Sequence, residues 1–222
     1  MSKQERIIGS CYLAFQQFVL PWLLSSVFGL LPFAASNVWL NLCYFVINFC
    51  AVLWIFRRFL KRSMNAVPKH FWRFLGVSVA GFVLYWFSNM ALTALIGLFF
   101  PGFANINDTT VAALAGSNIY IMAIGTVILV PVVEEVLFRG VIFGAFSARK
   151  KIAAYALSTL IFAFIHVMGY IGSFPPVTLI LCFLQYIPAG LCLAWAYEAS
   201  GSIFAPILIH TVVNALGILS LR

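Results

Sequence analysis

Seven apolar stretches, each long enough to cross a lipid bilayer, run almost end to end through this 222-residue chain. A bilayer core of about 30 Å needs roughly 20 mostly apolar residues in a helix, whereas barrel strands alternate over about ten residues. Only 8% of the residues are charged and 64% are hydrophobic, which leaves too little polar surface for a water-soluble domain. The sequence therefore predicts an all-α, polytopic transmembrane helical bundle of about seven helices. The expected spans are 7–30, 36–56, 74–100, 117–146, 152–170, 176–197 and 202–221.

The basic residues predict how the bundle is oriented. They lie before the first span, in the predicted loop 57–73 between the second and third spans, and at 149–151 after the fourth span. With seven spans these positions share one side, which the positive-inside rule assigns to the cytoplasm. We expect a multi-pass protein of the cell membrane with a cytoplasmic amino terminus, and no nucleic-acid partner despite the net charge of +8. The segments expected outside are 31–36, 101–116 and 170–175, with the carboxyl terminus.

Two adjacent glutamates, Glu134 and Glu135, lie inside the fourth apolar span of a chain that has only five acidic residues. A carboxylate at bilayer depth is costly unless it is paired or wetted, so such a residue is a candidate for a functional site. Glu135 and Arg139 are four residues apart and share one helix face, which predicts an ion pair. Glu134 is rotated by about 100° from Glu135 and is left for another role.

Polar residues on three helices are expected at similar depth. At about 1.5 Å of rise per residue, Glu134, His166, His210 and Asn214 lie roughly 14 to 22 Å from the cytoplasmic ends of their helices. His210 and Asn214 share a helix face, and Phe162 lies one turn from His166, where it would shield the imidazole from lipid.

Two prolines are expected to shape the helices near these groups. Pro131 precedes the glutamates and Pro206 precedes His210, and each is predicted to free a backbone carbonyl and bend its helix. The five cysteines all lie in apolar spans without metal-ligand spacing, which is typical of small apolar packing residues.

These residue types indicate hydrolysis by an activated water. The chain has no convincingly spaced serine–histidine or serine–lysine pair and no His-Glu-x-x-His motif. A buried glutamate and a histidine can orient and deprotonate water, while a second histidine and an asparagine amide can stabilise an oxyanion. The same groups could instead bind zinc, with Glu134, His166 and His210 as ligands. The residues alone leave both possibilities open.

Two other functions are compatible with the same residues. In a non-catalytic membrane protein, such as an immunity or scaffold protein, the polar groups would only hold the helices together. In a proton-coupled transporter, Glu134 and His166 would form a proton relay. The absence of a visible internal repeat weakens the transporter hypothesis.

Three motifs in order resemble one known family. Glu-Glu-x-x-x-Arg at 134–139, Phe-x-x-x-His at 162–166 and His-x-x-x-Asn at 210–214 are similar to the motifs of the CPBP family. These are the CAAX-protease and bacteriocin-processing intramembrane peptidases, also called the Abi family. The stretch YEASGSIFAPILIHTVVNAL is similar to the last motif and its lead-in. The resemblance covers roughly 117–217.

The resemblance implies specific roles. Glu134 and His166 would activate the water, His210 and Asn214 would stabilise the oxyanion, and Glu135 with Arg139 would support them. It favours a metal-independent glutamate mechanism with no cofactor, with zinc as the alternative.

The resemblance also bears on partners and organisation. The expected substrate is a peptide or lipidated peptide met at the lipid bilayer, and a compact chain without an organelle-targeting segment favours a prokaryotic source. We expect one membrane domain over 1–222, with the first three helices and an outer loop in 1–116 and the catalytic core in 117–217.

Overall fold

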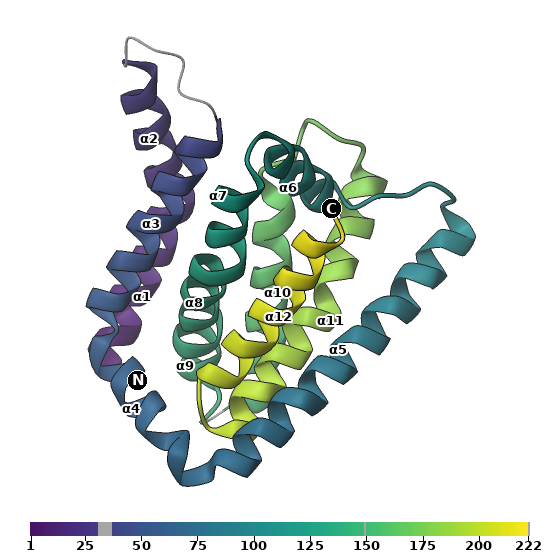
Figure 1. Cartoon of the computed structure of the whole chain (residues 1–222). Coiled ribbons are helices and arrows are strands. Elements are labelled where there is room, and N and C mark those ends of the chain that lie inside the picture. Colours follow the sequence, from purple (N-terminus) through teal and green to yellow (C-terminus); the bar gives the residue numbers. More distant parts are fainter. Residues whose placement is uncertain (31–36, 149, 222) are drawn as a thin grey trace.

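The polypeptide forms a bundle of helices (Figure 1). The structure is a computed structural model that describes residues 1–30, 37–148 and 150–221. Within these ranges it contains helices and no strand, so the predicted all-α class is confirmed. The expected outer segment 31–36 and the basic residue at 149 lie outside the described residues.

Within the described residues, six helical runs have the length and hydropathy of a membrane span. They are α1 to α2, α3, α4 to α5, α7 to α9, α10 and α11. The seventh predicted stretch forms α12, an apolar helix of 16 residues. At about 1.5 Å per residue, α12 measures roughly 24 Å, somewhat less than the apolar core of a bilayer. The bounds of the α-helices in these runs are α1 Lys3–Ala14, α2 Leu20–Gly29, α3 Asn37–Ile55, α4 Arg57–Ala66, α5 Phe71–Phe99, α7 Ile119–Ala123, α8 Val130–Glu135, α9 Gly144–Phe146, α10 Lys151–Met168, α11 Pro176–Ser200 and α12 Phe204–Leu219.

The predicted basic loop 57–73 is largely helical, which corrects the sequence-based expectation. It consists of α4 and a short 3₁₀ turn, η2 (Pro68–His70), before α5 begins. The apolar face of α4 is buried, and Ser63 on that face accepts a hydrogen bond from the backbone N–H of Ile203 at 2.8 Å. The basic residues alternate with these buried positions, so the amphipathic pattern, rather than the charge count, decides the conformation.

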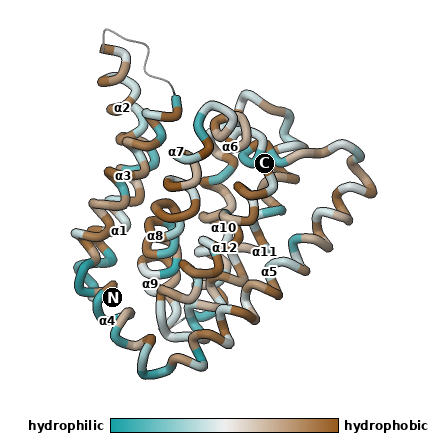
Figure 2. The backbone as a smooth tube through the Cα atoms, viewed as in Figure 1, coloured by the Kyte–Doolittle hydropathy of each residue, from teal (hydrophilic) through white to brown (hydrophobic). Residues whose placement is uncertain are grey.

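The helices are arranged as an N-terminal pair beside a C-terminal bundle (Figure 1). The run from α1 to α2 pairs with α3, and α4 leads at one end of the molecule into the long helix α5. Helix α5 crosses the bundle and packs against α11 and α12. The two termini lie at opposite ends, which fits an odd number of crossings. Hydropathy follows this layout, because the most hydrophilic part of the chain is gathered at the α4 end (Figure 2).

A further helix, α6 (Ile106–Ser117), lies across the end of the bundle opposite α4 (Figure 1). Its first residue, Ile106, packs with Val167 of α10 and Cys182 of α11. The side chain of Asn105 caps α6 by accepting from the N–H of Asn107 at 3.0 Å. The segment 101–116 was expected to lie outside, and most of it forms this helix over the end of the bundle.

Two of the helical runs contain a π turn that is followed by a proline. In the first run, η1 (Phe15–Val19) lets the N–H of Leu20 donate to Phe15, and the next donor position is Pro21, which has no N–H. The carbonyl of Gln16 therefore lacks a backbone donor. The hydroxyl of Tyr44 on α3 donates to it at 3.1 Å.

The same arrangement recurs just before the glutamates. In η3 (Ile124–Leu129), the N–H of Val130 donates to Gly125, and Pro131 leaves the carbonyl of Thr126 without a backbone donor. The amide of Asn214 on α12 donates to that carbonyl at 2.8 Å. In a membrane, a carbonyl freed by proline must be satisfied by a neighbouring helix, and both of these are.

Pro206 does not have the predicted effect. It is the third residue of α12, in the first helical turn, where backbone N–H groups have no intrahelical partner in any case. Only the effect expected of Pro131 is observed.

Candidate active site

Glu134 lies at the meeting point of two imidazoles. Its Oε2 is 3.9 Å from the Nε2 of His166 and 3.9 Å from the Nε2 of His210. The three residues come from α8, α10 and α12, the three helices that were expected to bring polar groups to one depth. Among the residues that the structure describes, no hydrogen bond reaches Glu134 Oε2, although this atom is buried.

Glu135 is the centre of a buried ionic network. Its Oε1 accepts from Arg139 at 3.0 Å and from Nδ1 of His210 at 2.8 Å, and the side chains of Glu135 and Arg139 have no exposed surface. The ion pair expected from the spacing is present. The third member, His210, was not foreseen, because the contact joins residues 75 positions apart.

Arg139 is enclosed on its other sides as well. The guanidinium carbon lies 4.4 Å from the centre of the Phe162 ring, and Nη2 donates to the carbonyl of Gly190 at 3.4 Å. Cation–π contacts of this kind are strongest where the cation is desolvated. Phe162 thereby connects the arginine of one motif to the histidine of the next.

His166 is held between two aromatic rings. Phe162 lies 4.5 Å away by ring centroids, and Tyr186 of α11 stacks on His166 at 4.1 Å with an interplanar angle of 27°. Nδ1 of His166 donates to the carbonyl of Phe162 at 2.8 Å. Stacking and hydrogen bond together fix the ring so that Nε2 faces Glu134. Tyr186 was not among the residues predicted for the site.

These contacts define the tautomers of both histidines. A carbonyl oxygen only accepts hydrogen bonds, and so does a carboxylate paired with arginine, so Nδ1 carries the proton in both rings. In neutral imidazoles the two Nε2 atoms would then present lone pairs to the Glu134 carboxylate. The two Nε2 atoms and the carboxylate are then all hydrogen-bond acceptors, and none of them can donate to another. The centre of the site therefore requires an added proton, a donor such as water, or a cation.

A metal is one way to satisfy such a set of acceptors. Two imidazole nitrogens and a carboxylate are the donor types that zinc prefers. In the described part of the chain, however, no three such side chains meet at the spacing of a metal-binding group. The expectation of a metal-free site stays a prediction, and no step below depends on a metal.

Asn214 is tied to the backbone of η3. One of its two amide hydrogens is used by the carbonyl of Thr126, as described above. The sequence predicts an oxyanion donor at this position. The structure gives Asn214 a structural contact, and its second amide hydrogen is available for another acceptor.

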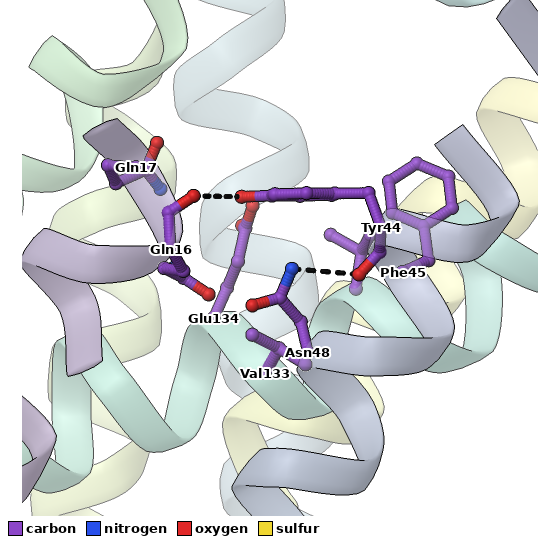
Figure 3. Close-up of a pocket in the computed structure, with 8 residues that line it drawn as sticks. Gln16, Gln17, Tyr44, Phe45, Asn48, Val133 and Glu134 are labelled. Atoms are coloured by element: carbon purple, nitrogen blue, oxygen red, sulfur yellow. Dashed lines mark hydrogen bonds between the residues drawn. The ribbon is translucent and has the colours of Figure 1, made fainter. Parts of the chain in front are cut away.

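The N-terminal helices contribute a wall that sequence reasoning missed. A cavity of about 40 Å³ lies beside Glu134 and is lined by polar residues of η1 and α3 (Figure 3). Its polar lining includes Gln16, Tyr44 and Asn48, three polar side chains in otherwise apolar helices. That contrast was the available signal, because a buried amide inside a membrane span requires a partner.

Comparisons with known proteins agree with this geometry. Residues 116–216 match the family model described as type II CAAX prenyl endopeptidase Rce1-like. This segment contains the three motifs and the glutamates and histidines that meet in the structure. Residues 116–216 are therefore similar to the Rce1-like family. The resemblance noted from the motifs is thus confirmed for this segment.

One curated relative also matches. The UPF0177 protein YxdF of Lactococcus lactis subsp. lactis (strain IL1403) is 32% identical over 90 residues. The match covers 40% of this chain and 44% of the relative, so it spans less than half of either protein. No solved structure matches. The family model begins at residue 116 and covers none of the helices before it.

Proposed function

We propose that this protein is an intramembrane endopeptidase that hydrolyses a peptide bond with a water activated by Glu134 and His166. The observation that carries the proposal is the Glu134 carboxylate, whose buried Oε2 accepts no hydrogen bond from the described residues and lies 3.9 Å from two oriented imidazoles. A water among these acceptors can donate to two of them, which directs its own lone pair outward. That is the orientation a hydrolytic water needs.

The proposed reaction proceeds through an addition and an elimination. The water oxygen attacks the peptide carbonyl carbon while its proton passes to Glu134. The carbon–nitrogen bond of the tetrahedral intermediate then breaks, and the proton passes from Glu134 to the departing nitrogen. The products are an amine and a carboxylic acid, which loses its remaining proton to water after release, and the site returns to its initial state.

Charge balance assigns a role to His210. Glu134 and Glu135 carry two negative charges and Arg139 carries one positive charge, so one further positive charge would neutralise the buried cluster. Nδ1 of His210 lies 2.8 Å from Glu135, and its Nε2 lies 3.9 Å from Glu134, so the ring stands between the two carboxylates. As an imidazolium, His210 would donate from Nε2 to the developing oxyanion. We propose the second amide hydrogen of Asn214 as a further donor.

The proposed substrate is a peptide or lipidated peptide that reaches Glu134 from within the bilayer. The family name of residues 116–216 refers to prenyl endopeptidases, which supports testing a farnesylated CAAX peptide first. Bacteriocin-type leader peptides are the second class to test. We further propose that the protein resides in a prokaryotic cell membrane with its amino terminus in the cytoplasm.

The test is peptide cleavage by purified protein in proteoliposomes, with and without a chelator. We expect Glu134→Gln to reduce kcat at least about 100-fold, because removal of a general base typically costs that much. Glu198→Gln is the matched control, since Glu198 lies at the end of α11 and pairs with Lys151 rather than with the site. Reversible loss of activity in chelator would favour the zinc alternative.

The same variants separate the other hypotheses. A scaffold or immunity protein would retain its phenotype with Glu134→Gln as long as the ionic network around Glu135 is intact. A transporter would show pH-gradient-dependent flux and no hydrolysis. Wild-type activity in Glu134→Gln would contradict the proposed mechanism.

A further inference from the structure

A groove of about 280 Å³ lies where α4 passes into η2, at the end of the molecule where hydrophilic residues gather (Figure 2). Its lining consists of Arg62, Asn65 and Ala66 of α4 and of Lys69 and His70 of η2. Two of these side chains are cations, and the other two polar ones also carry N–H groups that can donate hydrogen bonds. Among the described residues, no acidic side chain lines the groove, so its charge favours an anionic ligand.

The packing of α4 decides which of its side chains face outward. Phe59 and Ser63 are buried, and Phe59 belongs to the apolar core that also contains Ile203. Ser63 binds this core through the backbone N–H of Ile203, as described above. Arg62 and Asn65 are exposed and lie three residues apart, so they share one face of the helix. The groove is therefore a fixed surface on a helix that is docked against the bundle.

Two exposed tryptophans indicate the depth of this groove in a membrane. Trp54 lies near the end of α3, just before α4, and 71% of it is exposed. Trp72 lies at the start of α5, just after η2, and 79% of it is exposed. Tryptophan is enriched at the boundary between the apolar core of a bilayer and the headgroups. The segment between these two residues, which contains the groove, is thus at the level of the lipid phosphates.

The charge at this level is almost entirely of one sign. Segment 57–73 contains six lysine and arginine residues and no acidic residue. One carboxylate approaches from α1, where Oε2 of Glu5 lies 3.2 Å from Nη2 of Arg62. The side chain of Arg62 is still 63% exposed, and this ion pair uses only part of its N–H groups. Glu5 therefore competes for Arg62 without closing the groove.

We propose that this groove binds the phosphate group of an anionic phospholipid, with Arg62 and Lys69 as its charged partners. Asn65 and His70 provide further hydrogen-bond donors. The volume is close to the lower end of the roughly 300 to 1,000 Å³ of small-ligand pockets, which accommodates a headgroup and leaves the acyl chains outside. The position between two interfacial tryptophans favours a lipid over free phosphate. This site is separate from Glu134, and the inference does not depend on the proposed peptidase activity.

The first experiment compares ligands on the wild-type, full-length protein by native mass spectrometry. The probes are dioleoyl phosphatidylglycerol, which is anionic, dioleoyl phosphatidylcholine, which is zwitterionic, and inorganic phosphate. We expect phosphatidylglycerol to bind about tenfold more tightly than phosphatidylcholine, because basic residues near the headgroups attract net negative charge. Equal affinities for the two lipids overturn the inference. Displacement of phosphatidylglycerol by excess phosphate overturns it as well, because the ligand would then be the free anion.

The second experiment asks whether the groove, rather than the charge of α4 as a whole, binds the lipid. Arg62→Gln with Lys69→Gln removes both cations of the groove. The matched control, Arg58→Gln with Lys61→Gln, removes two exposed cations of α4 that do not line it. We expect the affinity for phosphatidylglycerol to fall about tenfold in the first variant and less than about threefold in the control, since only the first loses charge-assisted hydrogen bonds. Equal losses would indicate a diffuse basic surface and contradict the site.

A third variant has an expected effect of the opposite sign. Glu5→Gln removes the carboxylate that competes for Arg62, while glutamine can still form the capping box with Ser2. We expect the affinity for phosphatidylglycerol to rise about twofold to fivefold, the contribution of an ordinary surface ion pair. Damage to the fold does not raise affinity, so this result separates the site from a structural effect. An unchanged or lower affinity would contradict the role given to Arg62.

Discussion

Arg139 is a guanidinium with no exposed surface, and each of its partners is also buried. Breaking a buried ion pair by removing one member leaves an uncompensated charge, which costs far more than the pair contributes when both are present. The Nε of Arg139 has no partner among the described residues, so the enclosure is already incomplete. Stability at this position therefore depends on keeping both charges or removing both.

We expect Arg139→Met to lower the free energy of unfolding by about 3 to 5 kcal/mol, because Glu135 would remain charged and half-paired. The double variant Glu135→Gln with Arg139→Met should recover more than half of that loss, since no buried charge is left at the pair. Unfolding in detergent, followed by helical circular dichroism, measures both. Arg58→Met on the exposed face of α4 is the control, and equal stability of Arg139→Met and wild type would contradict the expectation.

At the scale of single residues, local spacing predicted part of the site. The pairing of Glu135 with Arg139 follows from four residues along one helix, and the structure contains it. The bond from His210 to Glu135, the stacking of Tyr186 on His166 and the approach of Gln16 to Glu134 join distant parts of the chain. Spacing within one helix contains no information about which face of another helix it meets, so these contacts could not be predicted.

At the scale of secondary-structure elements, two helical runs contain the same arrangement of a π turn, a proline and a side-chain donor. In η1 and η3, a π turn and a proline free one carbonyl, and a side chain from a facing helix donates to it. Removing that side chain leaves a buried acceptor unsatisfied, which costs about 1 to 3 kcal/mol. Restoring an N–H at the proline position would supply an alternative donor.

A double-mutant cycle at Pro131 and Asn214 tests this arrangement. We expect Asn214→Leu to destabilise the protein by about 1 to 3 kcal/mol, and by clearly less when Pro131→Ala is also present, because the alanine introduced there can donate its backbone N–H to the carbonyl of Thr126. Equal costs of Asn214→Leu in both backgrounds would argue against the arrangement.

The same cycle, assayed for cleavage, isolates any catalytic role of Asn214. If Asn214 also stabilises the oxyanion, activity stays low in the double variant even where stability recovers. If activity recovers together with stability, Asn214 has only a structural role, through its hydrogen bond to the carbonyl of Thr126.

The sequence was sufficient to predict where the membrane-spanning helices lie. It was not sufficient to predict the irregular turns within them. Long apolar stretches predict spans whose ends lie within a few residues of the observed helices, with the third span matching α5, because length and hydropathy decide whether a segment crosses a bilayer. Pro131 signalled an irregularity, yet proline alone does not distinguish a bend from a π turn. Segment 57–73 was predicted to be a loop because it contains many basic residues. The few residues that α4 buries among them were not recognised as one face of a helix.

For the molecule as a whole, the placement of the termini bears on orientation. The amino terminus and the basic helix α4 lie at one end, and the carboxyl terminus and α6 lie at the other (Figures 1 and 2). The positive-inside rule places the α4 end in the cytoplasm. That orientation stays a prediction, as does the division of the chain near residue 116.

Cysteine labelling in intact cells tests the orientation. In a cysteine-free background, an impermeant maleimide should label Ser173→Cys, in the exposed turn between α10 and α11, without permeabilisation. Lys69→Cys, exposed beside α4, should react only after the membrane is opened. The reverse pattern would mean that the protein is inserted the other way round.

The π turn η3 has a consequence for any attempt to shorten or splice this chain. A π turn accommodates one more residue than an α-helical turn, and one residue corresponds to a rotation of about 100° about the helix axis. The side chains of Ile119 to Leu129 are therefore rotated about the helix axis relative to Glu134, compared with a straight α-helix of the same sequence. Deleting a single residue between 124 and 129 would turn the π turn into an α-helical turn and preserve the direction of the carboxylate. Straightening the helix without a deletion would instead turn the carboxylate away from both imidazoles while leaving every motif in the sequence intact. A motif search would still recognise such a chain, although the geometry behind the motif would be gone.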